Sequence, residues 1–327
     1  MAGNMDGVAA PVRRFGLFGA CALLVVVFAL LLPDTFLSPR NLLNIAQQMS
    51  MLAVVAFAMT IVMVMNDFDL SVGSMASLAA ITAAVLFAAG YPVWVGVGAG
   101  LAVGLGGGLI NGVLVAHLRI LPFVATLGTL TVFSGLAFLI SDGKTIFGRA
   151  IPSAFSGFAR GGIPLDAIGL AGLKLPNLTL AAFALFVVVW LLLERSVMGR
   201  RLYIMGSNYE AARLGGIPVR KLRTWAFMLT GLGAALAGLM LASRVASANP
   251  TQGAGLMLDA IACVFLGMTM SRQGEPRVVY TLVGVLILGA LDNGLTQLAV
   301  NSYIREIVVG VIVLAAVASS SLGRGTR

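Results

Sequence analysis

The chain has 327 residues, of which 59% are hydrophobic and 10% are charged, and its mean hydropathy is +1.02. Soluble domains carry charge on about a quarter of their residues, so this composition excludes an ordinary soluble protein and predicts a membrane protein. The formal net charge of +9 is explained by basic cytoplasmic loops rather than by nucleic-acid binding.

The apolar runs predict a single all-α transmembrane domain over residues 1–327, a polytopic bundle of about ten helices. A bilayer core of about 30 Å needs about 20 apolar residues per helix, and the chain has room for that number with short loops. In chain order we expect the spans at residues 15–32, 47–65, 72–89, 93–115, 122–140, 178–193, 224–242, 256–270, 278–299 and 304–319.

The positions of Lys and Arg predict the orientation, because short cytoplasmic loops carry an excess of both. Arg13 and Arg14 place the N-terminus inside, and ten spans then place the C-terminus inside as well. The same count makes residues 195–223 a cytoplasmic loop and residues 141–177 an ordered periplasmic excursion. No small-residue cleavage pattern follows the first span, which is therefore expected to stay uncleaved.

The fourth span carries glycines at every fourth position, so they share one helix face. Close backbone packing over small residues is how helices associate in lipid. We therefore interpret this face as a packing seam, with a moving hinge as the alternative. The glycines are Gly96, Gly100, Gly104, Gly108 and Gly112.

Short similar sequences five spans apart suggest an inverted repeat. Asn111-Gly112 in the fourth span recurs as Asn293-Gly294 in the ninth, and Asp69 at the start of the third is matched by Asp259 in the eighth. An offset of five spans reverses the orientation in the membrane. Spans 2–5 and 7–10 are then the two halves, and in transporters of this kind the substrate passes between them.

Polar side chains inside spans are costly and are candidates for a substrate path. The alternative is that they satisfy neighbouring backbone groups, and for Asp67 and Asp69 that they cap the helix that follows them. The candidates for the path are Asp69, Asn111, Asp259, Asp292, Asn293 and Gln297.

The sequence contains no catalytic constellation, metal site or cofactor motif. Gly143-Lys144-Thr145 resembles the end of a phosphate-binding loop, but that motif needs a glycine at position 138, which is Phe. We expect a non-enzymatic chain whose energy comes from a partner.

The basic loop at residues 195–223 contains the pattern of one short helix. Ser207 or Asn208 can cap it, Glu210 lies in its first turn, and Gly215-Gly216 ends it. Such a helix between two spans is a suitable mechanical handle for a soluble partner, and the alternative is a solvated loop.

Together these features resemble the permease subunits of bacterial ABC sugar importers of the ribose/xylose/arabinose type, from Asn41 to about Val317. The matching stretches are residues 69–74 (Asp-Leu-Ser-Val-Gly-Ser), 123–127, 199–203, 206–217, 248–251 and 258–262.

The resemblance implies that residues 206–217 form the coupling helix that docks on an ATPase. It also implies a bacterial inner-membrane protein in contact with membrane lipid. Its partners would be a second permease, as a homodimer or heterodimer, an ATPase with two nucleotide-binding domains, and a periplasmic solute-binding protein. The coupling residues would be Gly206, Asn208, Glu210, Ala211, Ala212, Arg213, Gly216 and Ile217.

The sequence departs from the family pattern at two cytoplasmic turns. Asn66-Asp67-Phe68 stands where the family has Gly-Gly-Ile, and the later glycine-rich turn is replaced at residues 268–276. Fewer glycines predict stiffer turns. The departures leave the sugar and homodimerisation open.

Two other classes are compatible with these patterns. An ion- or proton-coupled secondary transporter would use Asp259 and Asp292, although neither has an evident buried cationic partner in the sequence. A membrane scaffold would use the loop at residues 195–223 for docking without transport.

Overall fold

The structure is a computed structural model that describes residue 19, residues 21–271 and residues 274–322. The basic residues Arg13, Arg14, Arg272, Arg324 and Arg327, which contribute to the predicted orientation, lie outside the described residues. The elements in chain order are the helix Cys21–Leu31, α2 (Pro39–Met63), α3 (Val72–Ala88), α4 (Val93–Ala116), α5 (Pro122–Ser141), β1 (Ile146–Phe147), η1 (Gly148–Ala150), α6 (Ser153–Arg160), β2 (Gly162–Pro164), η2 (Asp166–Ile168), β3 (Lys174–Pro176), α7 (Asn177–Trp190), η3 (Leu191–Arg195), α8 (Val197–Ser207), α9 (Tyr209–Leu214), α10 (Val219–Val245), β4 (Ser247–Ala248), α11 (Leu256–Met268), α12 (Val278–Gln297) and α13 (Ser302–Leu322).

The chain is an all-α polytopic membrane bundle. Within the described residues, six helices are long and apolar enough to cross a membrane, namely α2, α4, α5, α7 with η3, α10 and α12. The helix Cys21–Leu31, α3 and α11 are apolar but shorter. Large apolar side chains such as Trp94 and Leu139 are exposed on the outside of the bundle, as expected of a surface in contact with lipid.

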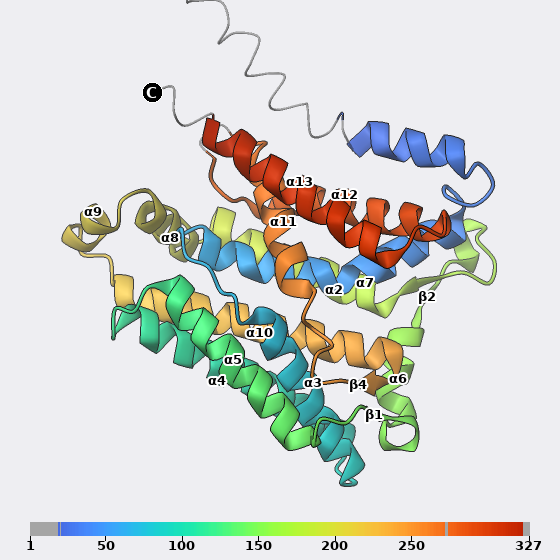
Figure 1. The fold of residues 1–327 in the computed structure, drawn as a ribbon, viewed down its shortest axis with the longest axis horizontal. Helices are drawn as coiled ribbons and strands as arrows, with labels where there is room; N and C mark the ends of the chain where they lie inside the picture. Colours follow the sequence, from blue (N-terminus) through green and yellow to red (C-terminus); the bar gives the residue numbers. More distant parts are fainter. Residues whose placement is uncertain (1–18, 20, 272–273, 323–327) are drawn as a thin grey trace, which may run out of the picture.

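The helices lie roughly along the long axis of the molecule, with α8 and α9 at one end and the four short strands near the other (Figure 1). We call these the α9 end and the strand end. β1 pairs with β4 and β2 pairs with β3, both antiparallel. The segment at residues 141–177 therefore has ordered structure at the strand end.

The helix contacts fall into corresponding pairs. α4 packs along α10, and α12 packs along α2. α3 lies against α4, α5 and α10, whereas α11 lies against α12, α13 and α2. Replacing α2–α5 by α10–α13 in that order, and the reverse, converts each of these contacts into another observed contact.

The short helices α3 and α11 both begin near the middle of the bundle (Figure 1). Their starts meet at Gly73 and Gly253, where a Cβ on either glycine would collide with the carbonyl oxygen of the other. The Ser77 hydroxyl accepts a hydrogen bond from the Gly253 N–H at 2.8 Å. Two short helices thus begin at the centre of the fold.

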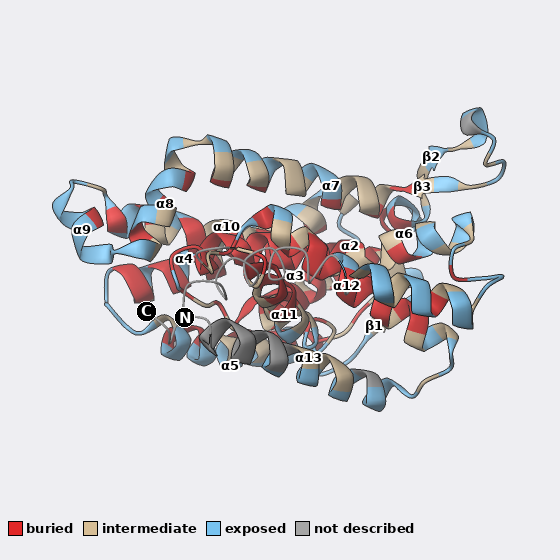
Figure 2. Cartoon of the chain, turned by 90° about the horizontal axis from the view of Figure 1, so that it is seen from above, coloured by how far each residue is buried: buried red, intermediate tan, exposed pale blue. Residues whose placement is uncertain are grey.

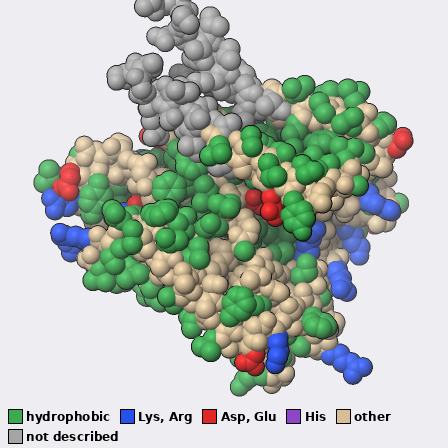
Figure 3. All heavy atoms as spheres, viewed as in Figure 1, with side chains coloured by type: hydrophobic (Ala, Val, Ile, Leu, Met, Phe, Trp, Pro, Cys, Tyr) green, Lys and Arg blue, Asp and Glu red, His purple; other side chains and the backbone are tan. Residues whose placement is uncertain are grey.

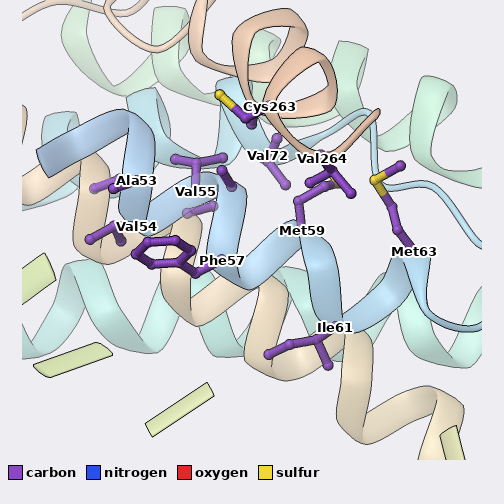
Figure 4. Packing of buried hydrophobic residues seen from close by; sticks show 14 of the residues in the cluster. Ala53, Val54, Val55, Phe57, Met59, Ile61, Met63, Val72, Cys263 and Val264 are labelled. Carbon is purple, nitrogen blue, oxygen red and sulfur yellow. The ribbon is translucent and has the colours of Figure 1, made fainter. Parts of the chain in front are cut away.

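Buried residues are concentrated on α2, α3 and α10 (Figure 2). The helices α7, α10, α11 and α12 pack against α2. In Figure 4, Met59 of α2 lies beside Val264 of α11, with Val72 of α3 and Cys263 of α11 nearby. Phe57 points away from these residues, and its ring lies against that of Phe186 on α7. Cys263 is fully buried as a free thiol, and Cys21 is half-buried and also free.

The glycine face of α4 lies against α10 and α3. A Cβ on Gly96 would collide with the Phe87 ring, and one on Gly100 would crowd Leu239. The remaining three glycines, Gly104, Gly108 and Gly112, face the α10 backbone between Thr224 and Gly231. Gly231 in turn faces the backbone of α4, so the two helices approach closely from both sides.

Two local predictions were wrong. The second helix was expected to begin at residue 47, but α2 begins at Pro39, because Ser38 caps it by accepting a hydrogen bond from the Asn41 N–H and proline is favoured in a first turn. The basic loop was expected to hold one helix, but it holds two, because Ser196 caps α8 through the Gly199 N–H.

Candidate functional site

A buried polar network precedes α3. One oxygen of the Asp69 carboxylate accepts hydrogen bonds from the Ser71 N–H (2.9 Å) and hydroxyl (2.6 Å). The Asn111 amide donates to Asp69 at 3.3 Å and to Ser71 at 2.8 Å, and its oxygen accepts from Thr129 at 2.7 Å. The network joins α4, α5 and the start of α3, so it brings together two predicted path residues, Asp69 and Asn111.

Asp67 does not cap α3, so the interpretation of Asp67 as a helix cap was wrong. Its carboxylate instead accepts hydrogen bonds from Nε and one terminal nitrogen of Arg223, both at 2.6 Å. Burial raises the pKa of Asp67, and the hydrogen bond and positive charge of Arg223 oppose that rise. The bidentate geometry is typical of a strong charge-assisted contact, and it ties the 64–71 segment to the first turns of α10.

Asp259 and Asp292 line one cavity of about 350 Å³ between α2, α10, α11, α12 and α13. Gln48 adds an amide, and the remaining lining is largely apolar. Arg244, a half-buried residue at the end of α10, interacts electrostatically with Asp292. Figure 3 shows carboxylates in a hollow near the middle of the visible face.

Asn293 and Gln297 lie apart from both groups, toward the strand end. Asn293 exchanges hydrogen bonds with Asn41 (3.0 and 3.2 Å) and accepts one from Gln297 at 2.8 Å. Gln297 also accepts from the Thr35 hydroxyl at 2.7 Å. These contacts fasten the end of α12 to the start of α2.

A smaller central pocket of about 140 Å³ lies where the starts of α3 and α11 meet, beside α5. Among the residues that the structure describes, no charged side chain lines it. Its polar lining consists of four hydroxyls, from Ser74, Ser77, Ser134 and Thr251. Sequence reasoning missed it, because isolated Ser and Thr residues in apolar runs carry no distinctive signal; residues 69–74 and 248–251 did fall in noted stretches.

The short helix expected in this segment is present as α9. Asn208 caps it by accepting a hydrogen bond from the Ala211 N–H at 2.9 Å, and Glu210 pairs with Arg213 at 2.8 Å on its exposed surface. Ala212 is buried, and Gly216 has a φ of +78°, a left-handed conformation that favours glycine.

A cavity of about 290 Å³ lies between α9, the α4–α5 turn and the start of α10. Its charged lining residues are Arg119, Glu210, Arg213, Arg220 and Arg223. The excess of positive charge makes this recess suitable for acidic groups of a soluble partner.

Replacement of Asp69 by Ala is expected to lower the free energy of unfolding by about 2–4 kcal/mol, because buried donors of Ser71 and Asn111 lose their acceptor. Asp69→Asn retains a carbonyl oxygen and should cost about half as much. Thermal unfolding of the detergent-solubilised protein measures both, with Asp34→Ala as the exposed control. Equal midpoints for Asp69→Ala and the wild type would contradict the network's structural role.

A family model described as branched-chain amino acid transport system / permease component matches residues 41–317. Several relatives are similar over nearly the whole chain. The ribose import permease protein RbsC of Bacillus subtilis (strain 168) is 41% identical over 317 residues, which cover 96% of this chain and 94% of that protein.

Two further relatives come from Escherichia coli (strain K12). The L-arabinose transport system permease protein AraH is 36% identical over 93% of this chain and 89% of its own length. The D-allose transport system permease protein AlsC is 32% identical over 94% of this chain and 92% of its own length. No solved structure matches the chain.

Proposed function

The chain belongs to the branched-chain amino acid transport system / permease component family, and we propose that it is the permease subunit of an ABC importer that carries a monosaccharide across the bacterial inner membrane. The observation that carries this function is the similarity to ribose, arabinose and allose permeases over more than nine-tenths of the chain. It is a multi-pass membrane protein, and ATP hydrolysis belongs to a separate subunit.

The lining of the central pocket supports a sugar over an amino acid. A branched-chain amino acid carries an ammonium and a carboxylate, and burying either charge without a partner is costly. The pocket offers neutral hydroxyls and no charged side chain. A neutral polyhydroxylated solute can exchange hydrogen bonds with such hydroxyls in place of water.

For the membrane topology, we propose ten spans arranged as an inverted repeat, α2–α5 and α10–α13. The corresponding helix contacts support this arrangement, as do the interrupted helices α3 and α11 that start at the centre. Interrupted helices near the bilayer midplane are characteristic of transporter binding sites. In this topology the α9 end and both termini are cytoplasmic, and residues 141–177 are periplasmic.

We further propose that residues 195–223 form the coupling loop and that α9 docks on the ATPase. The capped α9 helix with its exposed Glu210–Arg213 pair and the basic recess beside it support this role. The residues proposed to contribute are Gly206, Asn208, Glu210, Ala211, Ala212, Arg213, Gly216 and Ile217.

The proposed path runs through the central pocket. Asp69 and Asn111 support its wall from the start of α3, and Asp259 with Asp292 offers hydrogen-bond acceptors in a second cavity along the path. Asn293 and Gln297 act on the path only by holding α12 to α2. The partners implied by this function are an ATPase and a solute-binding protein, together with a second permease of the same or another sequence.

The second candidate, an ion- or proton-coupled secondary transporter, is favoured by one observation, the position of both Asp259 and Asp292 on the wall of one cavity. Such a transporter would need no ATPase. Its uptake would follow an ion gradient.

Uptake by the purified complex separates these functions. The tagged chain should co-purify in mild detergent with an ATPase and a solute-binding protein, and liposomes containing that complex should take up radiolabelled ribose, arabinose or allose only when ATP is present. Leucine serves as the amino-acid control and should not be taken up. Uptake driven by a proton gradient with the chain alone would overturn the importer assignment.

A further inference from the structure

The segment between α2 and α3, residues 64–71, lies directly against the coupling loop. The Asn66 side-chain amide donates a hydrogen bond to the Gly206 carbonyl oxygen at 2.6 Å. Gly206 itself has no room for a Cβ, because the Val64 carbonyl oxygen occupies that position. The end of α8 and the 64–71 segment are thus in backbone contact.

The conformation of this segment is set at Asn66, whose φ is +59°. Glycine adopts this left-handed region freely, and asparagine is among the side chains that tolerate it best. Asn66 and Asp67 occupy two of the three positions at which the sequence departs from the glycine-rich family pattern. Both use their side chains to contact the coupling loop or the helix that follows it.

The Asp67–Arg223 ion pair is largely shielded from water. The side chains of Arg223 and Asp67 are 19% and 5% exposed. By comparison, those of Arg277 and Glu194 are 45% and 21% exposed at a longer distance of 3.4 Å. A bidentate pair shielded from water depends strongly on geometry, so movement of one partner exerts a force on the other.

Arg223 also contacts the coupling helix. Its guanidinium carbon lies 5.7 Å from the centre of the Tyr209 ring, a cation–π distance. Tyr209 is the first residue of α9. Arg223 therefore joins α9 on one side to Asp67 on the other.

Asp67 is close in sequence to the centre of the fold. Two residues later, Asp69 holds Ser71 and Asn111, and α3 begins at Val72. The next residue, Gly73, meets Gly253 at the start of α11. Only a few backbone torsions separate Asp67 from the central pocket. A displacement of Asp67 is therefore transmitted to the wall of that pocket.

We infer that Asp67 and Arg223, with Asn66 bound to Gly206, form a clamp that makes the coupling helix and the start of α3 move together. They are positioning residues, and the clamp passes the movement of α9 to the wall of the central pocket. The inference rests on the proposed function. It explains the departure from the glycine-rich family pattern at Asn66 and Asp67, because their side-chain contacts replace a flexible turn.

The measurement is the number of sugar molecules imported per ATP hydrolysed by the reconstituted complex. Arg223→Lys removes the bidentate geometry but keeps the charge, and Asp67→Asn removes the charge. Both should lower the ratio about tenfold. Asp67 lies outside the basic recess, so Asp67→Asn should still assemble with its ATPase and hydrolyse ATP. The matched control is Arg277→Lys, the same change in a cytoplasmic-end ion pair outside the clamp, and its ratio should equal that of the wild type.

Asn66→Gly keeps the left-handed backbone accessible and removes only the contact with Gly206, so it keeps the test valid if the ion-pair variants do not assemble. It should lower the ratio about threefold. A wild-type ratio in Arg223→Lys and Asp67→Asn, or in Asn66→Gly where those two fail to assemble, would overturn the clamp. ATP-independent import by the wild-type complex would instead overturn the proposed function.

Discussion

Gly108→Val is expected to prevent α4 from packing on α10 and to leave little folded protein. A Cβ at this position would overlap the Phe227 carbonyl oxygen and approach the Met228 Cα within 2.7 Å. Both obstacles are backbone atoms, which cannot move aside as a side chain can. Overpacking of a well-packed core costs about 1–3 kcal/mol and occasionally more, and a β-branched side chain against backbone should reach or exceed about 3 kcal/mol.

The measurement is the amount of monodisperse protein after solubilisation, followed by its midpoint of thermal unfolding. Gly106→Val is the matched control, because nothing lies within 4 Å of a Cβ there, and it should stay within about 0.5 kcal/mol of the wild type. If Gly108→Val and Gly106→Val give the same yield and midpoint, the α4–α10 seam does not stabilise the fold.

The existence of the α4 packing surface was predictable from the sequence. Glycines at every fourth position must share a helix face, so the existence of a close packing surface follows from local periodicity. The helix that packs against this surface cannot be identified from the same periodicity. Gly231, which faces Gly104 from α10, lies far away in sequence, and no local pattern pairs the two helices.

The length of the helices was predictable only in part. Apolar runs located α3 and α11 within two residues at each end, but hydropathy reports composition and not depth in the membrane. That both helices begin at the centre of the bundle depends on how residues 64–71 and 246–255 fold inward. Helix α8 was missed for a related reason, since its basic residues made it resemble a loop.

The buried polar residues could be identified from the sequence, but their contacts could not. The cost of burying Asp69, Asn111, Asp259 and Asp292 made each of them a candidate from sequence alone. Their grouping required the fold: Asp69 meets Asn111 across 42 positions, and Asp67 meets Arg223 across 156. A sequence identifies the residues that need partners, and tertiary structure assigns the partners.

Ser134→Phe is expected to lower the initial rate of sugar uptake about a hundredfold, which corresponds to about 2.7 kcal/mol in barrier height. Ser134 lies on α5 and lines the central pocket of about 140 Å³. An aromatic ring is similar in size to a sugar ring, so it would occupy the space that the solute needs. Ser134→Ala removes only one hydroxyl and should lower uptake by no more than about tenfold.

Val132→Phe is the control that separates blockage from a general effect of bulk on α5. Val132 is 56% exposed and precedes Ser134 by two residues, which turns it to a different face of the helix. Its uptake should remain near the wild-type rate, and all three variants should assemble with the ATPase. Because blockage acts on the solute and not on the ATPase, basal ATP hydrolysis should persist in Ser134→Phe. Wild-type uptake by Ser134→Phe would show that the solute does not cross through the central pocket, which would overturn the proposed path.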